Sequence, residues 1–116
     1  MRVSMTIFVR AELTTLPGAR DGFVTLAKAL AAAADDEPGT LRYDWYVEAE
    51  PVRFVVIEEY ADSAAAFAHN AHCEELLSRV SEFAKMTLLQ VHGQLSPELE
   101  SWLASVPIAR TFPPLD

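Results

Sequence analysis

The stretch TLRYDWYVEAEPVRFVVIEEY, residues 40–60, decides the fold. Its first part, residues 40–48, alternates strictly, as the side chains of a half-buried β-strand do. One side carries Leu41, Tyr43, Trp45 and Val47, and the other carries Arg42, Asp44, Tyr46 and Glu48. Residues 53–60 are rich in β-branched and aromatic side chains, and the short connection AEPV (49–52) joins the two parts. We therefore predict an antiparallel pair of strands over 40–48 and 53–60.

The segments before this hairpin predict a strand and a helix. Residues 4–13 (SMTIFVRAEL) have the β-branched and aromatic content of a strand. Residues 21–36 (DGFVTLAKALAAAADD) place Phe23, Leu26 and Leu30 at helical spacing, and the following EPG ends the helix. After the hairpin, an alanine-rich segment predicts a second helix, which we expect to begin at a cap formed by Asp62 or Ser63 and to run to about Phe83, with a break near Asn70.

The last third of the chain predicts a strand, a short helix and a tail. Residues 85–95 (KMTLLQVHGQL) are apolar on both faces in their middle, as in a central strand. Residues 96–106 (SPELESWLASV) have Ser at the cap and Pro at the first helical position, which is a strong helix start, and Trp102 is expected to anchor this helix by packing. The Pro-rich residues 107–116 are expected to be irregular.

The resulting order, β-α-β-β-α-β plus a short helix, is that of the ferredoxin-like fold, an α+β fold with helices on one face of a four-stranded antiparallel sheet. We treat residues 1–116 as a single domain, with a core over 3–95 and a C-terminal helix and tail over 96–116. The strand segments FVVI (54–57) and TLLQV (87–91) are apolar on both faces, which is unusual for a sheet with one face in water. A second copy of the sheet would cover that face, so we predict a homodimer, a dimeric α+β barrel.

The charge balance argues against two classes of partner. The 116-residue chain has 9 basic and 17 acidic residues and a net charge of −8, so it lacks the attraction that nucleic acid and anionic membranes exert on basic proteins. No apolar run approaches the roughly 20 residues of a membrane span, and the start of the chain lacks the apolar core of a signal peptide. The single cysteine forms no internal disulfide. We expect a soluble cytoplasmic protein that binds neither nucleic acid nor membranes.

The pattern PGTLRYDWYVEAEPVRFVVIEEYADSAAAFAHNAH (38–72) resembles the antibiotic biosynthesis monooxygenase family, which includes quinol monooxygenases. The matching residues are Gly39, Tyr43, Phe54, Glu59, Phe67 and His69. The later segment HGQLSPEL (92–99) is also similar, so the resemblance covers about residues 3–100. Two positions depart from the family pattern. Many relatives carry Trp where this chain has Tyr60, and their second helix histidine would fall on Glu74, whereas this chain has His72.

The resemblance implies a cofactor-independent monooxygenase that oxidises a small electron-rich aromatic, a hydroquinone or a polyketide-like phenol, with dioxygen. A protein base would remove the hydroxyl proton, and the anion would react with dioxygen in a dry cavity. The chain has no glycine-rich nucleotide loop and no flavin fingerprint, so we predict no cofactor. Two alternatives stay open, a noncatalytic dimeric protein that binds a small molecule and a haem-binding or haem-degrading relative. Tyr60 argues against haem degradation, whereas His72 keeps a haem ligand available.

His69 is the predicted catalytic base, with Glu59 behind it to hold the imidazole in one tautomer or to take up a proton. We expect His69 in a cavity between the helices and the sheet, hydrogen-bonded directly or through water to Glu59 or to a tyrosine hydroxyl. A structural ion pair or a helix cap is an equally good interpretation of Glu59. The predicted substrate-binding residues are Tyr43, Tyr60, Phe67 and His72.

A metal site is the other interpretation of the helix after the hairpin. His69, His72 and Cys73 are spaced to lie on one helix face and could bind zinc or copper, with Glu59 as a further ligand. Alternatively, His69 is a hydrogen-bonded residue and Cys73 a small buried apolar one. We favour this second interpretation and predict no metal site, because the motif lacks a second pair of ligands.

Overall fold

The computed structural model describes residues 4–48 and 52–115. The elements in chain order are β1 (Ile7–Thr15), α1 (Arg20–Ala34), β2 (Thr40–Val47), β3 (Arg53–Tyr60), α2 (Ser63–His72), α3 (Glu74–Ser78), the 3₁₀ turn η1 (Val80–Glu82), β4 (Ala84–His92), α4 (Pro97–Ala104) and β5 (Ala109–Phe112). The predicted α+β class and ferredoxin-like order are confirmed. The expected connection over 49–52 lies mostly outside the described residues.

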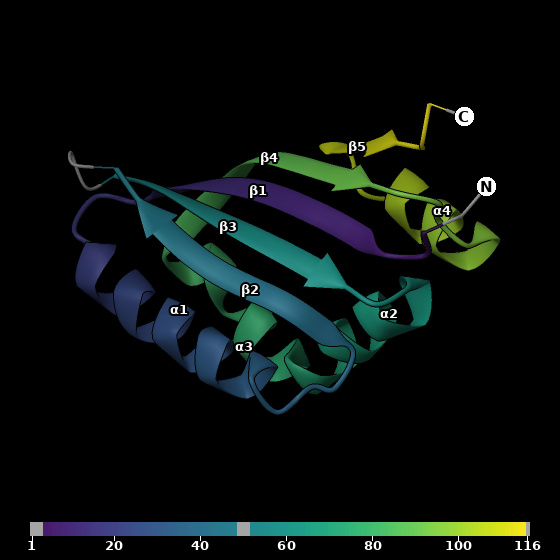
Figure 1. The fold of residues 1–116 in the computed structure, drawn as a ribbon. Coiled ribbons are helices and arrows are strands. Elements are labelled where there is room, and N and C mark those ends of the chain that lie inside the picture. Colours follow the sequence, from purple (N-terminus) through teal and green to yellow (C-terminus); the bar gives the residue numbers. More distant parts are fainter. Residues whose placement is uncertain (1–3, 49–51, 116) are drawn as a thin grey trace.

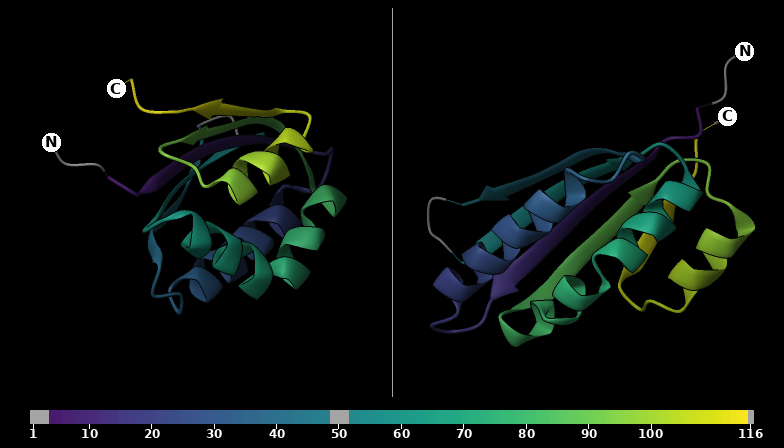
Figure 2. Two further views of the ribbon diagram at one scale, coloured as in Figure 1. Left: turned by 90° about the vertical axis from the view of Figure 1, so that its right-hand side faces the viewer. Right: turned by 90° about the horizontal axis from the view of Figure 1, so that it is seen from below.

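The five strands form one sheet in the order β2-β3-β1-β4-β5. β1 lies in the middle and pairs antiparallel with β3 and β4, and β2 pairs antiparallel with β3, so the predicted hairpin is confirmed. Its register sets Tyr46 opposite Val55 and Tyr43 opposite Glu58. Figures 1 and 2 show that the four helices all lie on the same face of this sheet. In the described part of the chain, no helix covers the opposite face, which we call the uncovered face.

The core lies between the sheet and the helices. Alternate residues of the central strands point toward the helices and are buried, among them Ile7, Val9, Leu13, Phe54, Val56 and Val91. α1 contributes Phe23 and Leu30, which are completely buried, and α4 contributes Leu99 and Leu103. Within the described residues, none of the helices is long and apolar enough to cross a lipid bilayer.

The helix after the hairpin begins as predicted but breaks later than predicted. The Asp62 carboxylate caps it by accepting a hydrogen bond from the backbone N–H of Ala65 at 2.8 Å. α2 then continues past Asn70 to His72, Cys73 caps its end, and α3 begins at Glu74. His69, His72 and Cys73 therefore lie in the last turn of α2 and at its end. The Ser96 cap of α4 is also confirmed, since its hydroxyl accepts from the N–H of Leu99 at 3.1 Å.

The prediction of an irregular tail was wrong. Residues Ala109–Phe112 form β5, which pairs in parallel with β4 and places Phe112 beside His92. The two rings stack with centroids 5.1 Å apart. Local sequence could not show this strand, because the backbone groups that it pairs with belong to the free edge of β4. Trp102 is less of an anchor than expected, since it is 44% exposed and touches Phe67 edge-on.

Gly39 fixes the loop between α1 and β2 against α2. A Cβ atom at this position would lie 2.6 Å from the Cβ of Ala65, which is closer than two carbon atoms can approach. The backbone carbonyl of Gly39 also accepts from the N–H of Ala61 at 2.9 Å. Because the loop passes so close to α2, the side chain of Glu37, two residues earlier, reaches the last turn of that helix.

Candidate active site

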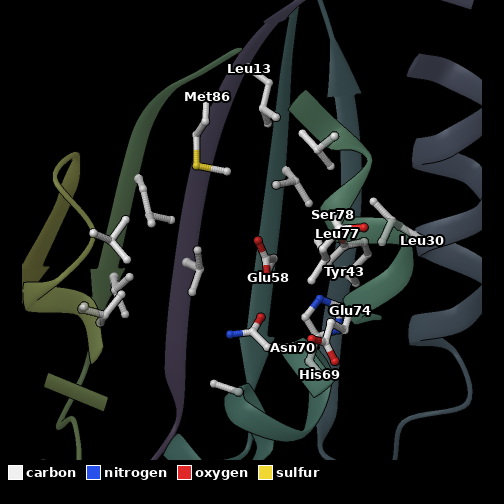
Figure 3. Close-up of a pocket in the computed structure, with 18 of the residues that line it drawn as sticks. Leu13, Leu30, Tyr43, Glu58, His69, Asn70, Glu74, Leu77, Ser78 and Met86 are labelled. Carbon is white, nitrogen blue, oxygen red and sulfur yellow. The ribbon is translucent and has the colours of Figure 1, made fainter. Parts of the chain in front are cut away.

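A pocket of about 850 Å³ lies between the helix-covered face of the sheet and the helices (Figure 3). Most of its wall is aliphatic, with side chains from β1, β4 and α4 such as Val9, Leu89, Val91 and Leu103. Five of its polar residues come from β2, β3 and α2: Tyr43, Glu58, Tyr60, His69 and Asn70. Further polar residues of the lining follow on α3 and beyond, among them Glu74 and Ser78 (Figure 3). An apolar pocket with a few convergent polar groups is the usual form of a small-molecule site.

His69 is buried at the wall of this pocket, with 2% of its surface exposed. Its position in a cavity between helix and sheet agrees with the prediction, but its expected hydrogen-bond partner was wrong. The Nδ1 atom of His69 lies 2.8 Å from Oε1 of Glu37, a residue of the loop after α1.

The Glu37 carboxylate is surrounded by hydrogen-bond donors. Oε1 accepts from the Thr40 hydroxyl at 2.6 Å as well as from His69, and Oε2 lies 2.7 Å from Nδ1 of His72 and 3.3 Å from Sγ of Cys73. Burial alone would raise the pKa of Glu37, but these donors together lower it from 4.5 to about 2. The carboxylate is therefore ionised at neutral pH and acts as an acceptor toward each of its neighbours.

This arrangement selects the tautomer of His69. Since an ionised carboxylate can only accept, Nδ1 of His69 carries the hydrogen in this bond. In the neutral ring the lone pair then resides on Nε2, on the side away from Glu37. The ring is held between two tyrosines, with centroid distances of 4.9 Å to Tyr43 and 5.4 Å to Tyr60. Such an imidazole can accept a proton at Nε2, and Glu37 can stabilise the positive charge that results.

Glu58 of β3 is a second carboxylate that faces the pocket. Its side chain accepts a short hydrogen bond from the Tyr60 hydroxyl. Burial raises the pKa of Glu58, although the bond from Tyr60 opposes the rise. Burial, and then the nearby charge of Glu58, raise the pKa values of Tyr43 and Tyr60, so both phenols stay protonated and can donate hydrogen bonds.

The expected contact between Glu59 and His69 is absent. Phe54, Val56, Glu58 and Tyr60 share the helix-covered face, so the alternation of a strand directs Glu59 to the uncovered face. There it pairs in register with Phe8 of β1 and Arg42 of β2. Neighbouring residues of a strand point to opposite faces of the sheet, so Glu58 faces the helices and Glu59 does not.

The structure brings together three of the six predicted site residues, His69, Tyr43 and Tyr60. Phe67 is not among the residues that line the pocket, and it packs against a buried cluster that includes Val9, Val91 and Leu99. His72 is about half exposed and lies outside the pocket, beside Glu37. Sequence reasoning missed Glu37, Glu58 and Asn70. For Glu58 the signal existed in the alternation of residues 54–60, whereas no local pattern connects Glu37 to a helix 32 residues later.

Asn70 is a further polar side chain at this end of the pocket, where Glu74 of α3 also lies (Figure 3). It follows His69 on α2 and is partly buried, and its amide forms no hydrogen bond with another residue of the described chain. Trp45 also lines the pocket, and its buried indole N–H has no acceptor among the described residues. A bound molecule with carbonyl or hydroxyl oxygens would find a donor in the amide of Asn70.

Comparison with known families identifies the family to which this fold belongs. Residues 6–86 match the model of the antibiotic biosynthesis monooxygenase family. The chain belongs to this family. The matched range runs from β1 into β4 and includes Tyr43, Glu58, Tyr60, His69 and Asn70, so the polar end of the pocket lies within the family domain. The predicted resemblance is confirmed.

Solved structures give the same result for the fold. MupZ from Pseudomonas fluorescens matches with a TM-score of 0.82 at 19% identity, over 96% of this chain and 91% of its own. PA3566 from Pseudomonas aeruginosa is 26% identical, with a TM-score of 0.64 over 78% of this chain and 93% of its own. SnoaB from Streptomyces nogalater, a cofactor-independent oxygenase, has a TM-score of 0.66 at 17% identity over 74% of this chain and 89% of its own. No curated protein sequence is similar enough to count as a relative.

Proposed function

We propose that the protein is a cofactor-independent monooxygenase that oxidises an electron-rich aromatic, a hydroquinone or a polyketide-like phenol, with dioxygen. The observation that supports this most is the pair of Glu37 and His69 at the wall of an apolar pocket. Family membership and the shared fold with the oxygenase SnoaB are consistent with it.

His69 is the base in this proposal. A phenolic hydroxyl that docks against His69 gives its proton to Nε2, and the ring becomes an imidazolium. Glu37, ionised and bonded to Nδ1 at 2.8 Å, stabilises that charge and holds the ring plane during the transfer. Glu37 thus takes the positioning role that we predicted for Glu59.

The phenolate is the electron donor. Dioxygen takes electrons from the electron-rich ring, one of its oxygen atoms forms a new bond to a ring carbon, and the other leaves as water with protons from the substrate. For a hydroquinone the product is a hydroxyquinone, so substrate and dioxygen together supply all atoms and electrons. The aliphatic wall from β1, β4 and α4 keeps water from the anion and its oxygenated intermediate.

The other polar residues orient the substrate. Tyr43 and Asn70 can donate hydrogen bonds to oxygens on the aromatic ligand, and Glu58 keeps the Tyr60 hydroxyl directed to itself. Tyr43 and Tyr60 also present ring surface to a planar ligand. We therefore assign Tyr43, Tyr60 and Asn70 to binding and Glu58 to the placement of Tyr60.

We also propose that the protein is a homodimer through the uncovered face. Phe8, Tyr46 and Phe112 are exposed there, and the half-buried Val55 and Ile57 lie among them on β3. Ion pairs such as Arg42 with Asp44, 2.7 Å apart, accompany these apolar side chains. A second copy would remove this mixed surface from water, as a symmetric interface does.

Oxygen uptake with a panel of hydroquinones and anthrone-type phenols tests the function. We expect uptake with at least one of them and a ~10²- to 10⁴-fold lower kcat in His69→Asn. Asn keeps a donor for Glu37 at the place of Nδ1 but offers no base. Glu59→Gln, on the uncovered face, is the matched control and should retain activity.

The alternative functions predict different results when oxygen uptake is combined with haemin titration and ligand binding. A Soret band after haemin titration that depends on His69 or His72, without uptake on the phenols, would favour a haem protein. Tight binding of an aromatic that is never oxidised would indicate a noncatalytic binding module. Uptake that is equal in wild type and His69→Asn would refute the assignment of the base.

A further inference from the structure

The donor atoms around Glu37 form a compact group at the end of α2. One carboxylate oxygen of Glu37, Nδ1 of His69 and Sγ of Cys73 all lie within 4.8 Å of one another. The individual separations are 2.8 Å from Nδ1 to Oε1, 3.3 Å from Sγ to Oε2 and 3.8 Å from Sγ to Nδ1. We propose that Glu37, His69 and Cys73 form a binding site for a thiophilic divalent cation, with zinc as the best match.

The spacing of these atoms fits tetrahedral zinc. With bonds of about 2.3 Å to sulfur and about 2.0–2.2 Å to nitrogen and oxygen, two ligands of a tetrahedral zinc ion lie roughly 3.3–3.6 Å apart. The 2.8 Å and 3.3 Å separations are to different oxygens of Glu37, and with one ligand oxygen from Glu37 the three atoms lie within 4.8 Å of one another. Small side-chain rotations therefore suffice to bring all three ligands onto one ion. This proposal differs from our sequence-based expectation of no metal site, because the further ligand comes from the loop after α1 and not from Glu59.

The scaffold already holds the three ligands. His69 and Cys73 are one helical turn apart, so both face Glu37, and their side chains are buried. Glu37 is fixed from the other side by the close packing of Gly39 on Ala65 and by the Thr40 hydroxyl. His72, 48% exposed and 2.7 Å from Glu37, lies on the solvent side of the group. The fourth position is therefore left to His72 or to water.

The donor set also determines the kind of cation. A thiolate and an imidazole favour zinc and similar ions over magnesium and calcium, which prefer oxygen ligands alone. On binding, the Cys73 thiol releases its proton to solvent, and the ring proton of His69 passes from Nδ1 to Nε2, so that the Nδ1 lone pair binds the cation. One carboxylate and one thiolate then balance the double positive charge, so the buried site is neutral overall.

Occupancy has one chemical consequence, which rests on the proposed function. An imidazole that binds a cation through Nδ1 carries its proton on Nε2, so it cannot accept another proton there from a phenol. The occupied site and the working base therefore exclude each other, and zinc acts as an inhibitor. The existence of the site does not depend on this consequence, and its test uses binding alone.

The test uses the full chain without an affinity tag, treated with a chelator and then titrated with Co²⁺. We expect one equivalent to produce a thiolate-to-cobalt charge-transfer band, which Zn²⁺ removes by displacement. Cys73→Ser should abolish the band and weaken zinc binding at least about tenfold in calorimetry. His92→Gln is the matched control, because His92 lies at the β4 edge beside Phe112, away from this group.

A second measurement on the unaltered protein covers the case in which Cys73→Ser does not fold. Zinc should slow alkylation of Cys73 in native protein by at least about tenfold, whereas magnesium should leave the rate unchanged. Absence of the cobalt band in wild type, or an alkylation rate that zinc does not change, would overturn the proposal. Equal zinc affinity in wild type and a folded Cys73→Ser variant would overturn it as well.

Discussion

The substitution Glu37→Gln tests the hydrogen-bonded group on which the site depends. The Glu37 carboxylate accepts from Thr40, His69, His72 and Cys73, and its side chain is 8% exposed. Gln has the same shape, but its NH₂ group would face two donors that now find an acceptor there. Buried donors without an acceptor cost about 1–3 kcal/mol each. We therefore expect Glu37→Gln to fold and to be clearly less stable.

The pKa of Glu37 gives the size of the effect and its dependence on pH. A drop from 4.5 to about 2 corresponds to about 3 kcal/mol of stability at neutral pH. Because the folded-state pKa lies below the ordinary value, this stabilisation is present above pH 4.5 and is lost as the pH falls through about 2. Gln does not titrate, so the stability difference between wild type and Glu37→Gln should shrink by about 2 kcal/mol between pH 5 and pH 3.

Urea unfolding followed by tryptophan fluorescence at fixed protein concentration measures this difference. Glu75→Gln, an exposed carboxylate on α3, serves as the matched control and should change stability by less than about 0.5 kcal/mol. The reasoning is refuted if Glu37→Gln is as stable as wild type at pH 7. It is also refuted if the deficit at pH 3 equals that at pH 5.

Three further predictions concern packing, charge and assembly. Gly39→Ala should lower the stability by about 1–3 kcal/mol, because the new Cβ atom would clash with Ala65. Thermal unfolding should show that Ala65→Gly restores part of this loss, and an unchanged Tm in Gly39→Ala would contradict the prediction. Since burial raises the pKa of Glu58, the charge of this carboxylate opposes folding at neutral pH. Glu58→Gln should therefore be at least as stable as wild type at pH 7, and the difference in unfolding free energy should close in acid; a stability loss above about 1 kcal/mol at pH 7 would contradict this. Ile57→Glu on the uncovered face should yield monomer in sedimentation, and an intact dimer would argue for another interface.

The sequence predicted those parts of the fold that depend on local signals. Alternation over 40–48 and the caps at Asp62 and Ser96 involve residues close together in the chain, and all three were confirmed. β5 was missed, because a short apolar run after prolines becomes a strand only when a free edge such as that of β4 lies beside it.

The candidate site was also predicted only in part, because some of its contacts join residues that are far apart in the chain. Family resemblance and position led to His69, Tyr43 and Tyr60, which the fold brings into contact. The choice between Glu58 and Glu59 required the face of β3 to be fixed, and buried Phe54 and Tyr60 fix it in favour of Glu58. Glu37 could not be predicted as a site residue, because it belongs to the segment EPG, which is typical of a helix end. Its role arises from its contact with His69, which is distant in the sequence.

Incorporation of isotope-labelled dioxygen tests whether the protein is an oxygenase that uses His69 as its base. We expect dialysed, chelator-treated protein to transfer one labelled oxygen atom from dioxygen, and none from water, into the product of an oxidised hydroquinone. His69→Asn should do so ~10²- to 10⁴-fold more slowly while keeping the wild-type circular dichroism spectrum. Label that enters from water, or an equal rate in folded His69→Asn, would contradict the claim that His69 is the base of a dioxygen-dependent oxidation.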